Sequence, residues 1–185
     1  MNHSETMDIP SGWIKKGIFT LVYGRAGTGK THLAYYAYLV AKSKNLDPVL
    51  IATEPGTTLF LRKIQYTEYH VAHTLDELVR LVTSNSLRNK FIIIDSVNWH
   101  YRSKPGIESG KILMYLSSVA RSTGGLYTAQ VSGEGLLPSG APYIIPWAHI
   151  VIRTSKINDK FLAESLRPHR KTLMYEIRGK DLRWL

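Results

Sequence analysis

The sequence of 185 residues contains no cysteine and no long apolar run. Without cysteine the chain has neither disulfides nor cysteine-ligated metal sites. A helix that spans a bilayer needs about 20 consecutive apolar residues, and no stretch of this sequence approaches that length. Residues 1–6 also lack the basic and then apolar layout of a secretion signal. We therefore expect a cytoplasmic protein that has no membrane partner.

Acidic residues are scarce as well. The chain has 14 Asp and Glu against 24 Lys and Arg, which gives a formal net charge of +10. Residues 151–185 hold nine of the basic residues and four of the acidic ones, so half of the excess lies in the last fifth of the chain. A polyanionic partner, nucleic acid first of all, would account for this charge. A basic surface that is merely solvated is the alternative.

One complete motif stands out against these absences. Residues 24–31 read Gly-Arg-Ala-Gly-Thr-Gly-Lys-Thr, which is the G-x-x-x-x-G-K-[ST] phosphate loop. The apolar run 18–23 predicts a buried strand before it, and apolar residues spaced i, i+3, i+4, i+7 and i+8 from Leu33 predict a helix after it. The motif requires this order of strand, loop and helix. The alternative is a glycine turn that binds nothing.

The chemistry of a phosphate loop follows from its residue types. The glycines let backbone N–H groups surround phosphate oxygens at the positively polarised start of the helix. Lys30 would reach the β- and γ-phosphates, and the Thr31 hydroxyl would ligate Mg²⁺. The predicted cofactors are therefore ATP and Mg²⁺. The predicted nucleotide-binding residues are Gly24, Arg25, Ala26, Gly27, Thr28, Gly29, Lys30, Thr31 and His32.

Predicted strands and helices alternate along the chain, which indicates an α/β fold with a mainly parallel central sheet flanked by helices and a C-terminal β meander. We expect a single domain over 1–185 with a short N-terminal extension, 1–16. The polar stretch 98–110 has no predicted element, and 132–146, rich in Gly and Pro, is expected to be a loop. The expected strands are 18–23, 49–52, 69–71, 91–95, 126–131, 149–153, 161–166 and 173–177, and the further helices are 57–65, 75–82 and 112–120.

Three polar residues lie at the carboxyl ends of predicted strands, the edge at which parallel α/β sheets bind their ligands. Asp95 closes an apolar run, as in a Walker B strand, and would bind Mg²⁺ through water or orient Thr31. Glu54 could act as a base or orient an attacking water. Gln130, one of only two Gln in the chain, could bond the γ-phosphate or that water. For each of them, a solvated or loop-bonded side chain is the alternative.

In the order of its motifs the chain resembles the RecA/RadA recombinase ATPases, and archaeal RadA and its short paralogs most of all. The resemblance runs from about residue 17 to residue 185 and implies a RecA-like core. The segments that carry it are the Walker A motif 24–31, Ala-Thr-Glu at 52–54, Ile-Asp-Ser at 94–96, Asn-Trp-His-Tyr-Arg at 98–102, Thr-Ala-Gln-Val at 128–131 and Ile-Arg-Thr-Ser-Lys at 152–156.

The resemblance implies catalytic roles for three residues. Glu54 takes the place of the glutamate that activates water, Gln130 that of the glutamine before the second DNA-binding loop, and Lys30 that of the phosphate-binding lysine. The basic segment after that loop supplies Arg153 and Lys156 as candidates to reach a neighbouring subunit's γ-phosphate.

The resemblance also implies DNA as a partner, single-stranded more than double-stranded. The segment 98–102 resembles the start of the first DNA-binding loop, and Arg102, Lys104 and Lys111 are the basic residues of that loop. In the second loop, Tyr143 and Trp147 could stack on bases or anchor the loop to the core.

Two features depart from the RadA pattern. About 16 residues precede the first strand, where RadA carries a helix–hairpin domain and a polymerisation linker. The second loop, 132–147, contains no Lys or Arg, although DNA-binding loops normally supply phosphate contacts.

The leading hypothesis is a RadA-type paralog that binds and hydrolyses ATP, binds DNA, and assists recombination and repair. Its protein partners would be a RadA-type recombinase or further copies of itself. The second hypothesis is an interaction protein that holds ATP without turnover and binds a recombinase instead of DNA. The third is a small-molecule P-loop kinase, although no Arg-rich lid segment is evident.

Overall fold

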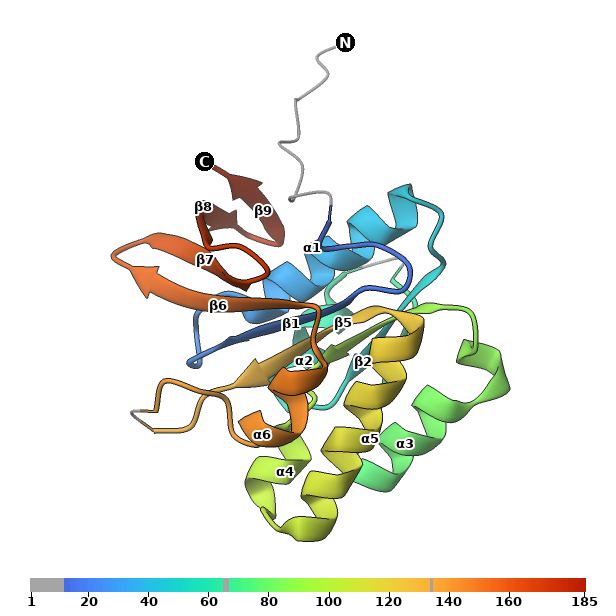
Figure 1. Ribbon diagram of the computed structural model, residues 1–185. Helices are drawn as coiled ribbons and strands as arrows, with labels where there is room; N and C mark the ends of the chain where they lie inside the picture. The colour runs from blue at the N-terminus through green and yellow to red at the C-terminus, as the bar shows by residue number, and fades with distance from the viewer. Residues whose placement is uncertain (1–11, 65–66, 134) are drawn as a thin grey trace.

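The computed structural model describes residues 12–64, 67–133 and 135–185. Most of the expected N-terminal extension, 1–16, and the last residue of the expected helix 57–65 lie outside these ranges. In the described part of the chain, one sheet runs through the molecule and helices cover both of its faces (Figure 1).

Nine strands of the described residues form this sheet, in the order β3-β2-β4-β5-β1-β6-β7-β8-β9. The strands from β3 to β6 are parallel, and β6 to β9 continue as an antiparallel meander. The predicted α/β architecture is therefore confirmed. The strands are β1 (Phe19–Gly24), β2 (Pro48–Ala52), β3 (Tyr69–Val71), β4 (Phe91–Asp95), β5 (Gly125–Gln130), β6 (Ile150–Ile157), β7 (Lys160–Arg167), β8 (Lys171–Arg178) and β9 (Asp181–Trp184).

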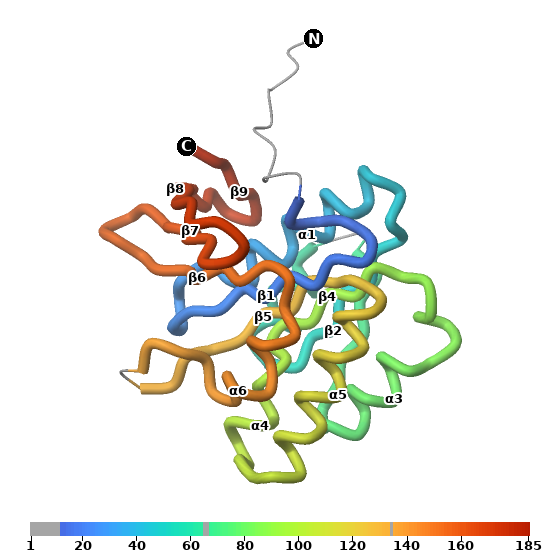
Figure 2. Tube along the Cα trace, viewed as in Figure 1, coloured from blue at the N-terminus to red at the C-terminus, as the bar shows by residue number. Residues whose placement is uncertain are grey.

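Helices α1 and α2 pack on one face of the sheet, and α3 and α5 pack on the other (Figures 1 and 2). None of the helices in the described residues combines the length and the apolar character needed to cross a membrane. The helices are α1 (Lys30–Ser43), α2 (Pro55–Arg62), α3 (Leu75–Thr83), α4 (Trp99–Ser103), α5 (Ile107–Thr123) and α6 (Ala141–Ile144), with 3-10 turns η1 (Asn85–Leu87) and η2 (Ile145–Trp147).

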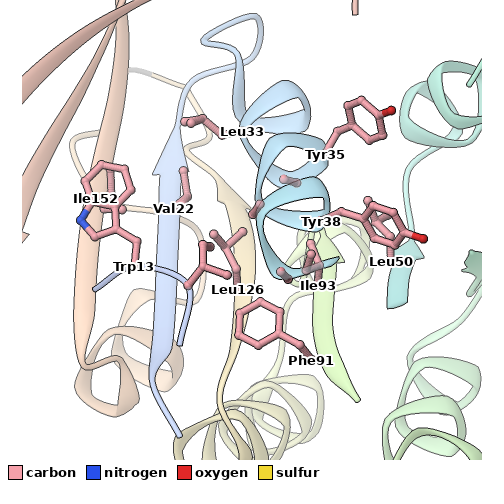
Figure 3. Packing of buried hydrophobic residues seen from close by; sticks show 14 of the residues in the cluster. Trp13, Val22, Leu33, Tyr35, Tyr38, Leu50, Phe91, Ile93, Leu126 and Ile152 are labelled. Atoms are coloured by element: carbon pink, nitrogen blue, oxygen red, sulfur yellow. The ribbon is translucent and has the colours of Figure 1, made fainter. Parts of the chain in front are cut away.

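Alternation along the strands divides the core into two clusters. In β4, Phe91 and Ile93 face α1, whereas Ile92 and Ile94 face α3 and α5. By the same alternation the next residue, Asp95, faces the α1 side of the sheet. The phosphate loop leads into α1 on that side. Figure 3 shows the cluster on that face, with Val22, Leu33, Leu50, Ile93 and Leu126 among its members.

The register of the parallel strands brings their carboxyl ends to one edge of the sheet. Gly24 at the end of β1 lies beside Gln130 of β5 and Thr154 of β6. Ala52 at the end of β2 lies beside Asp95 of β4. The segments that follow β1, β2, β4 and β5 therefore meet at this edge, as expected for an open α/β sheet.

The structure differs from the sequence-based expectation at short elements. The stretch 98–110 contains α4 and the start of α5, and 132–146 contains α6 and most of η2. Helices of four or five residues are too short to produce an apolar period, so the pattern does not reveal them. Helix α2 begins at Pro55, two residues before the predicted start, because proline fits the first helical turn. Strand β9 was not predicted.

A capping box starts α3 at Thr74. The Glu77 backbone N–H donates to the Thr74 hydroxyl at 3.1 Å. In return the Glu77 carboxylate accepts from the His73 N–H at 2.7 Å. The two bonds satisfy donors that the first turn of a helix leaves without partners.

Thr74→Ala is expected to lower the free energy of unfolding by about 1 kcal/mol, because it removes the acceptor for the Glu77 N–H. Urea denaturation followed by circular dichroism measures this change. Thr83→Ala, at the other end of α3, is the matched control, since the exposed Thr83 hydroxyl bonds the Val79 and Arg80 carbonyls of its own helix and caps no N–H group. Equal effects of the two substitutions would contradict the capping role.

Candidate nucleotide-binding site

The phosphate loop connects β1 to α1 and depends on its glycines. Gly27 and Gly29 have φ of 73° and 80°, in the left-handed region that glycine adopts without strain. Gly24 passes so close to β6 that a Cβ atom there would lie 2.5 Å from the Thr154 carbonyl oxygen. The backbone at these three positions thus requires glycine, as the motif predicts for Gly24 and Gly29.

Two strands of the meander hold this loop in place. The Thr28 hydroxyl donates to the Arg25 carbonyl at 2.8 Å and lies 2.7 Å from the Thr154 hydroxyl of β6. The Tyr175 hydroxyl of β8 donates to the Thr28 carbonyl at 3.0 Å. Because Tyr175 is fully buried, its position fixes that of the loop. Sequence reasoning missed Tyr175 and Thr154, which lie more than 120 residues away from the loop.

Lys30 is buried at the base of the loop, with 8% of its surface exposed. Its Nζ donates to the Arg25 carbonyl at 2.7 Å. Burial lowers the pKa of Lys30, and the positive charge of Arg102 acts in the same direction. The carboxylates of Asp95 and Glu54 oppose this shift. Burial therefore disfavours the positive charge of Lys30, and a bound anion would stabilise that charge.

Asp95 lies at the centre of the site and is almost fully buried. Its Oδ2 accepts hydrogen bonds from the hydroxyls of Thr31 and Thr57, each at 2.7 Å. Its Oδ1 accepts from the Thr128 hydroxyl. The carboxylate thereby joins α1, α2 and β5. Thr57 and Thr128 were not predicted; only Thr128 left a signal, as a polar residue two positions before Gln130 on the same face of a buried strand.

Thr31 and Asp95 fit a role in holding Mg²⁺. The Thr31 hydroxyl donates its proton to Asp95, so the lone pairs of its oxygen remain to ligate a cation. Among the described residues, no group of three or more His, Asp or Glu is placed to hold a metal by itself. Mg²⁺ commonly takes one or two protein oxygens, with phosphates and waters completing the shell. The oxygen donors found here match that pattern.

Glu54 follows β2 and lies at the start of α2. Its Oε1 accepts from the Ser96 hydroxyl at 2.6 Å, and this bond sets the orientation of the carboxylate. Thr53, the residue before it, bonds both backbone groups of Ser96, at 2.7 and 2.9 Å. The ends of β2 and β4 are therefore tied together directly after Asp95.

Gln130 ends β5 at the same cavity. Its backbone is gripped by the fully buried Asn98, whose Oδ1 accepts from the Gln130 N–H and whose Nδ2 donates to the Gln130 carbonyl, both at 2.9 Å. The same Nδ2 also donates to the Ser139 carbonyl of the second loop, at 3.0 Å. Asn98 was missed as a functional residue, because a single Asn after a strand is typical of any turn.

These groups line one cavity of about 400 Å³. One wall is apolar and comes from Phe60 of α2, Phe161 of β7 and Ile177 of β8. The His32 ring lies 4.8 Å from that of Phe60, and burial lowers its pKa. The residues that line the cavity are Ala26, Gly27, Gly29, Lys30, Thr31, His32, Glu54, Gly56, Phe60, Asp95, Gln130, Phe161 and Ile177.

The predicted DNA-binding residues lie outside this cavity. Lys111 forms an exposed ion pair with Glu108 at 2.8 Å, and Lys104 directly follows α4. Tyr143 packs on Gly110 of α5, where a Cβ atom would lie 2.5 Å from its ring. Trp147 is partly buried against the cluster below α5. Both aromatic residues thus anchor the second loop to the core in this structure, which was one of the two alternatives.

The predicted inter-subunit residues form contacts within the chain. The Arg153 guanidinium pairs with Glu164 of β7 at 2.5 Å. The Lys156 Nζ lies 5.3 Å from the centre of the Phe161 ring. Their role toward a neighbouring subunit stays a prediction.

Lys30→Met is expected to abolish nucleotide binding yet to stabilise the nucleotide-free protein by about 1 kcal/mol. Because burial lowers the pKa of Lys30, folding at pH 7 carries a penalty that a neutral side chain of similar length removes. The penalty fades as the pH rises through the lowered pKa of the folded state toward the ordinary lysine value of 10.5, so the advantage of the variant shrinks.

Urea denaturation at pH 7 and at pH 10 measures both effects. Lys42→Met serves as the control, because Lys42 is an exposed residue in the last turn of the same helix. A loss of stability for Lys30→Met at pH 7, relative to this control, would show that the buried charge is fully compensated.

Comparisons with known proteins identify the fold. No protein-family model matches the sequence, and no curated protein is significantly similar to it. Among solved structures, 389 chains match. One is a KaiC-like protein from the hyperthermophilic archaeon Pyrococcus horikoshii OT3, with a TM-score of 0.68 and 16% sequence identity over 95% of this chain and 92% of that chain. The chain therefore has the RecA-like α/β fold that the sequence predicts, and this likeness does not single out the RadA paralogs.

Proposed function

We propose that this protein binds ATP with Mg²⁺ in the cavity at the carboxyl edge of its sheet and hydrolyses it. The observation that carries the proposal is that Lys30, Thr31, Glu54 and Asp95 line one cavity although they come from three separate segments of the chain. Phosphoryl transfer depends on positioning and on charge stabilisation, with little covalent chemistry for the protein to perform. A lysine, two metal-binding oxygens and a carboxylate that reaches water are the groups it requires.

Each residue has a distinct role in this proposal. Lys30 binds the β- and γ-phosphates, and the loop N–H groups surround them. Thr31 and Asp95 hold Mg²⁺, which when bound offsets the negative charge of the phosphates. Glu54, oriented by Ser96, positions a water and accepts its proton. Gln130 bonds the γ-phosphate or the water from the neighbouring strand.

Glu54→Gln is expected to lower ATP turnover by at least about 100-fold, because the amide no longer accepts a proton. ATP affinity should change little, since the phosphate-binding groups remain. A phosphate-release assay together with equilibrium binding of a fluorescent ATP analogue measures the two quantities. Glu108→Gln, an exposed carboxylate on α5, is the control. Turnover that survives in Glu54→Gln would remove Glu54 from the catalytic role.

We further propose that the ATPase acts as a DNA-binding accessory protein in recombination and repair. The order of the RadA-like segments and the net charge of +10 support this role. Arg102 lies on α4, Lys104 directly follows that helix, and Lys111 lies in the first turns of α5. This segment follows the strand that carries Asp95. The state of the nucleotide would reach the two loops through Glu54 and Gln130.

The expected result is an affinity for single-stranded DNA that rises when a non-hydrolysable ATP analogue is bound and falls steeply with salt. Replacing Lys104 and Lys111 together by Ala should reduce the slope of log affinity against log salt by about 1.4, at about 0.7 per phosphate contact. The double replacement of Lys42 and Lys63 by Ala is the control. Fluorescence anisotropy of a labelled oligonucleotide provides the measurement, and no binding even at low salt would contradict the DNA-binding role.

One observation favours a second candidate, a protein that holds ATP without turnover and binds another protein. The second loop has no Lys or Arg, and it exposes Leu136 and Leu137, 74% and 57% accessible. Neighbouring exposed leucines suit a protein surface better than a phosphate backbone. Under this candidate the wild-type protein would show no turnover and no affinity for DNA, and it would retain a recombinase in a pull-down.

A further inference from the structure

A second cavity, of about 370 Å³, lies beside the nucleotide cavity and shares Glu54 with it. Its volume falls within the range of about 300–1,000 Å³ that is typical of small-molecule sites. The walls come from α2, from α4 and from the end of β3, so three separate parts of the chain build it. None of the roles proposed above uses this cavity.

One stripe of α2 forms the first wall. Pro55, Thr58, Leu59 and Arg62 line the cavity, and their spacing of i, i+3, i+4 and i+7 places them along one side of the helix. Leu61, which lies off this stripe, is buried in the core. Leu59, by contrast, is 59% accessible. The helix therefore offers apolar surface to a ligand on the side that the core does not use.

Trp99 of α4 forms an aromatic wall and is partly buried. The Arg102 guanidinium lies 5.0 Å from the centre of the Trp99 ring, in a cation–π contact that holds the indole in place. His100, which also lines the cavity, has its Nε2 3.0 Å from the Ala72 carbonyl oxygen, and this contact orients its ring. A planar group that stacks on an indole already held in this way costs little side-chain entropy.

Positive charge adjoins this largely apolar cavity. Arg62 is exposed and forms no ion pair within the described residues. Among the described residues that line the cavity, Glu54 is the one carboxylate, and it already bonds the Ser96 hydroxyl. An aromatic wall beside a guanidinium group favours a ligand that combines a planar ring with a phosphate.

We propose that this cavity binds a base of single-stranded DNA, which stacks on Trp99 while the adjoining phosphate pairs with Arg62. The inference rests on the proposed DNA-binding role and assigns it a site. Bases of a single strand are available for stacking on aromatic side chains, and such stacking tolerates any sequence. A duplex keeps its bases paired and stacked, so the cavity selects single strands.

A base in this cavity would affect ATP turnover through Glu54. The carboxylate lines both cavities, and Glu54 is the residue at which α2 begins. A base held against α2 and α4 restricts the start of α2, so Glu54 keeps one orientation toward the attacking water. Phosphate release should therefore rise when oligothymidylate is added to the wild type, and it should not rise with an abasic strand.

The test is a cycle of four affinities, measured by fluorescence anisotropy at low salt with a non-hydrolysable ATP analogue present. Wild type and Trp99→Ala each bind labelled oligothymidylate and an abasic strand of equal length, which has the same charge but no bases. We expect the loss of the bases to weaken binding to the wild type by at least about tenfold. The same loss should have little effect on binding to Trp99→Ala, because the two changes remove one contact.

Further variants separate stacking from folding and from charge. Trp99→Phe keeps an aromatic ring and should retain most of the dependence on bases. Trp99→Leu keeps an apolar side chain without the ring, should lose that dependence, and serves if Trp99→Ala does not fold. Arg62→Ala should lower the slope of log affinity against log salt by about 0.7, the value for one phosphate contact. Lys63→Ala, an adjacent exposed cation that does not line the cavity, is the matched control and should leave the slope unchanged.

Two results would overturn the base site. One is an equal loss on removal of the bases for the wild type and Trp99→Ala, which would place the stacked bases elsewhere on the protein. The other is equal affinity of the wild type for both strands, which would leave the cavity to a side chain of a protein partner. Turnover that rises equally with both strands would contradict the link to Glu54. Failure of the proposed DNA-binding role is recognised separately, because the wild type would then bind neither strand, and the inference would fall with that role.

Discussion

The site depends on the hydrogen bonds that three hydroxyl groups donate to the buried carboxylate of Asp95. Thr31, Thr57 and Thr128 come from α1, α2 and β5, so one side chain sets the distance between both helices and the sheet. A carboxylate so deeply buried would be very costly without such partners. The arrangement also fits the proposed metal role of Thr31, since its hydroxyl donates to Asp95 and leaves the lone pairs of its oxygen free to ligate a cation.

The sequence predicts the residues that line the cavity better than it predicts the residues that position them. Lys30, Thr31, Glu54, Asp95 and Gln130 follow from a motif and from the rule that polar residues gather at the carboxyl ends of parallel strands, and the structure brings them to one cavity. Their supports, by contrast, are lone Thr, Ser, Asn and Tyr residues that occur in every loop or strand. Their contacts with the site follow only from the register of strands that are far apart in the sequence. Helices α4 and α6 are also too short to show a helical period of apolar residues.

The C-terminal meander shows how composition can mislead. By sequence it is notable for holding half of the net charge. In the structure, its residues support the candidate site: the buried Tyr175 bonds the loop at Thr28, and the partly buried Phe161 and Ile177 contribute to the apolar wall of the cavity. Basic residues on the exposed positions of these strands add charge without entering the site. The count of charges along the chain thus describes the exposed side of the meander, whereas the alternation along its strands indicates which residues face the cavity.

Charge within the cavity gives the strongest constraint on mechanism. Lys30 carries a positive charge that the carboxylates of Asp95 and Glu54 favour, but Asp95 already accepts hydrogen bonds from three hydroxyls and Glu54 accepts one from Ser96. The Lys30 ammonium donates instead to the neutral Arg25 carbonyl. A polyphosphate would offer this lysine a charged acceptor. Because Gln130 lines the cavity and shares Asn98 with the second loop, binding at the cavity would also bias the position of that loop.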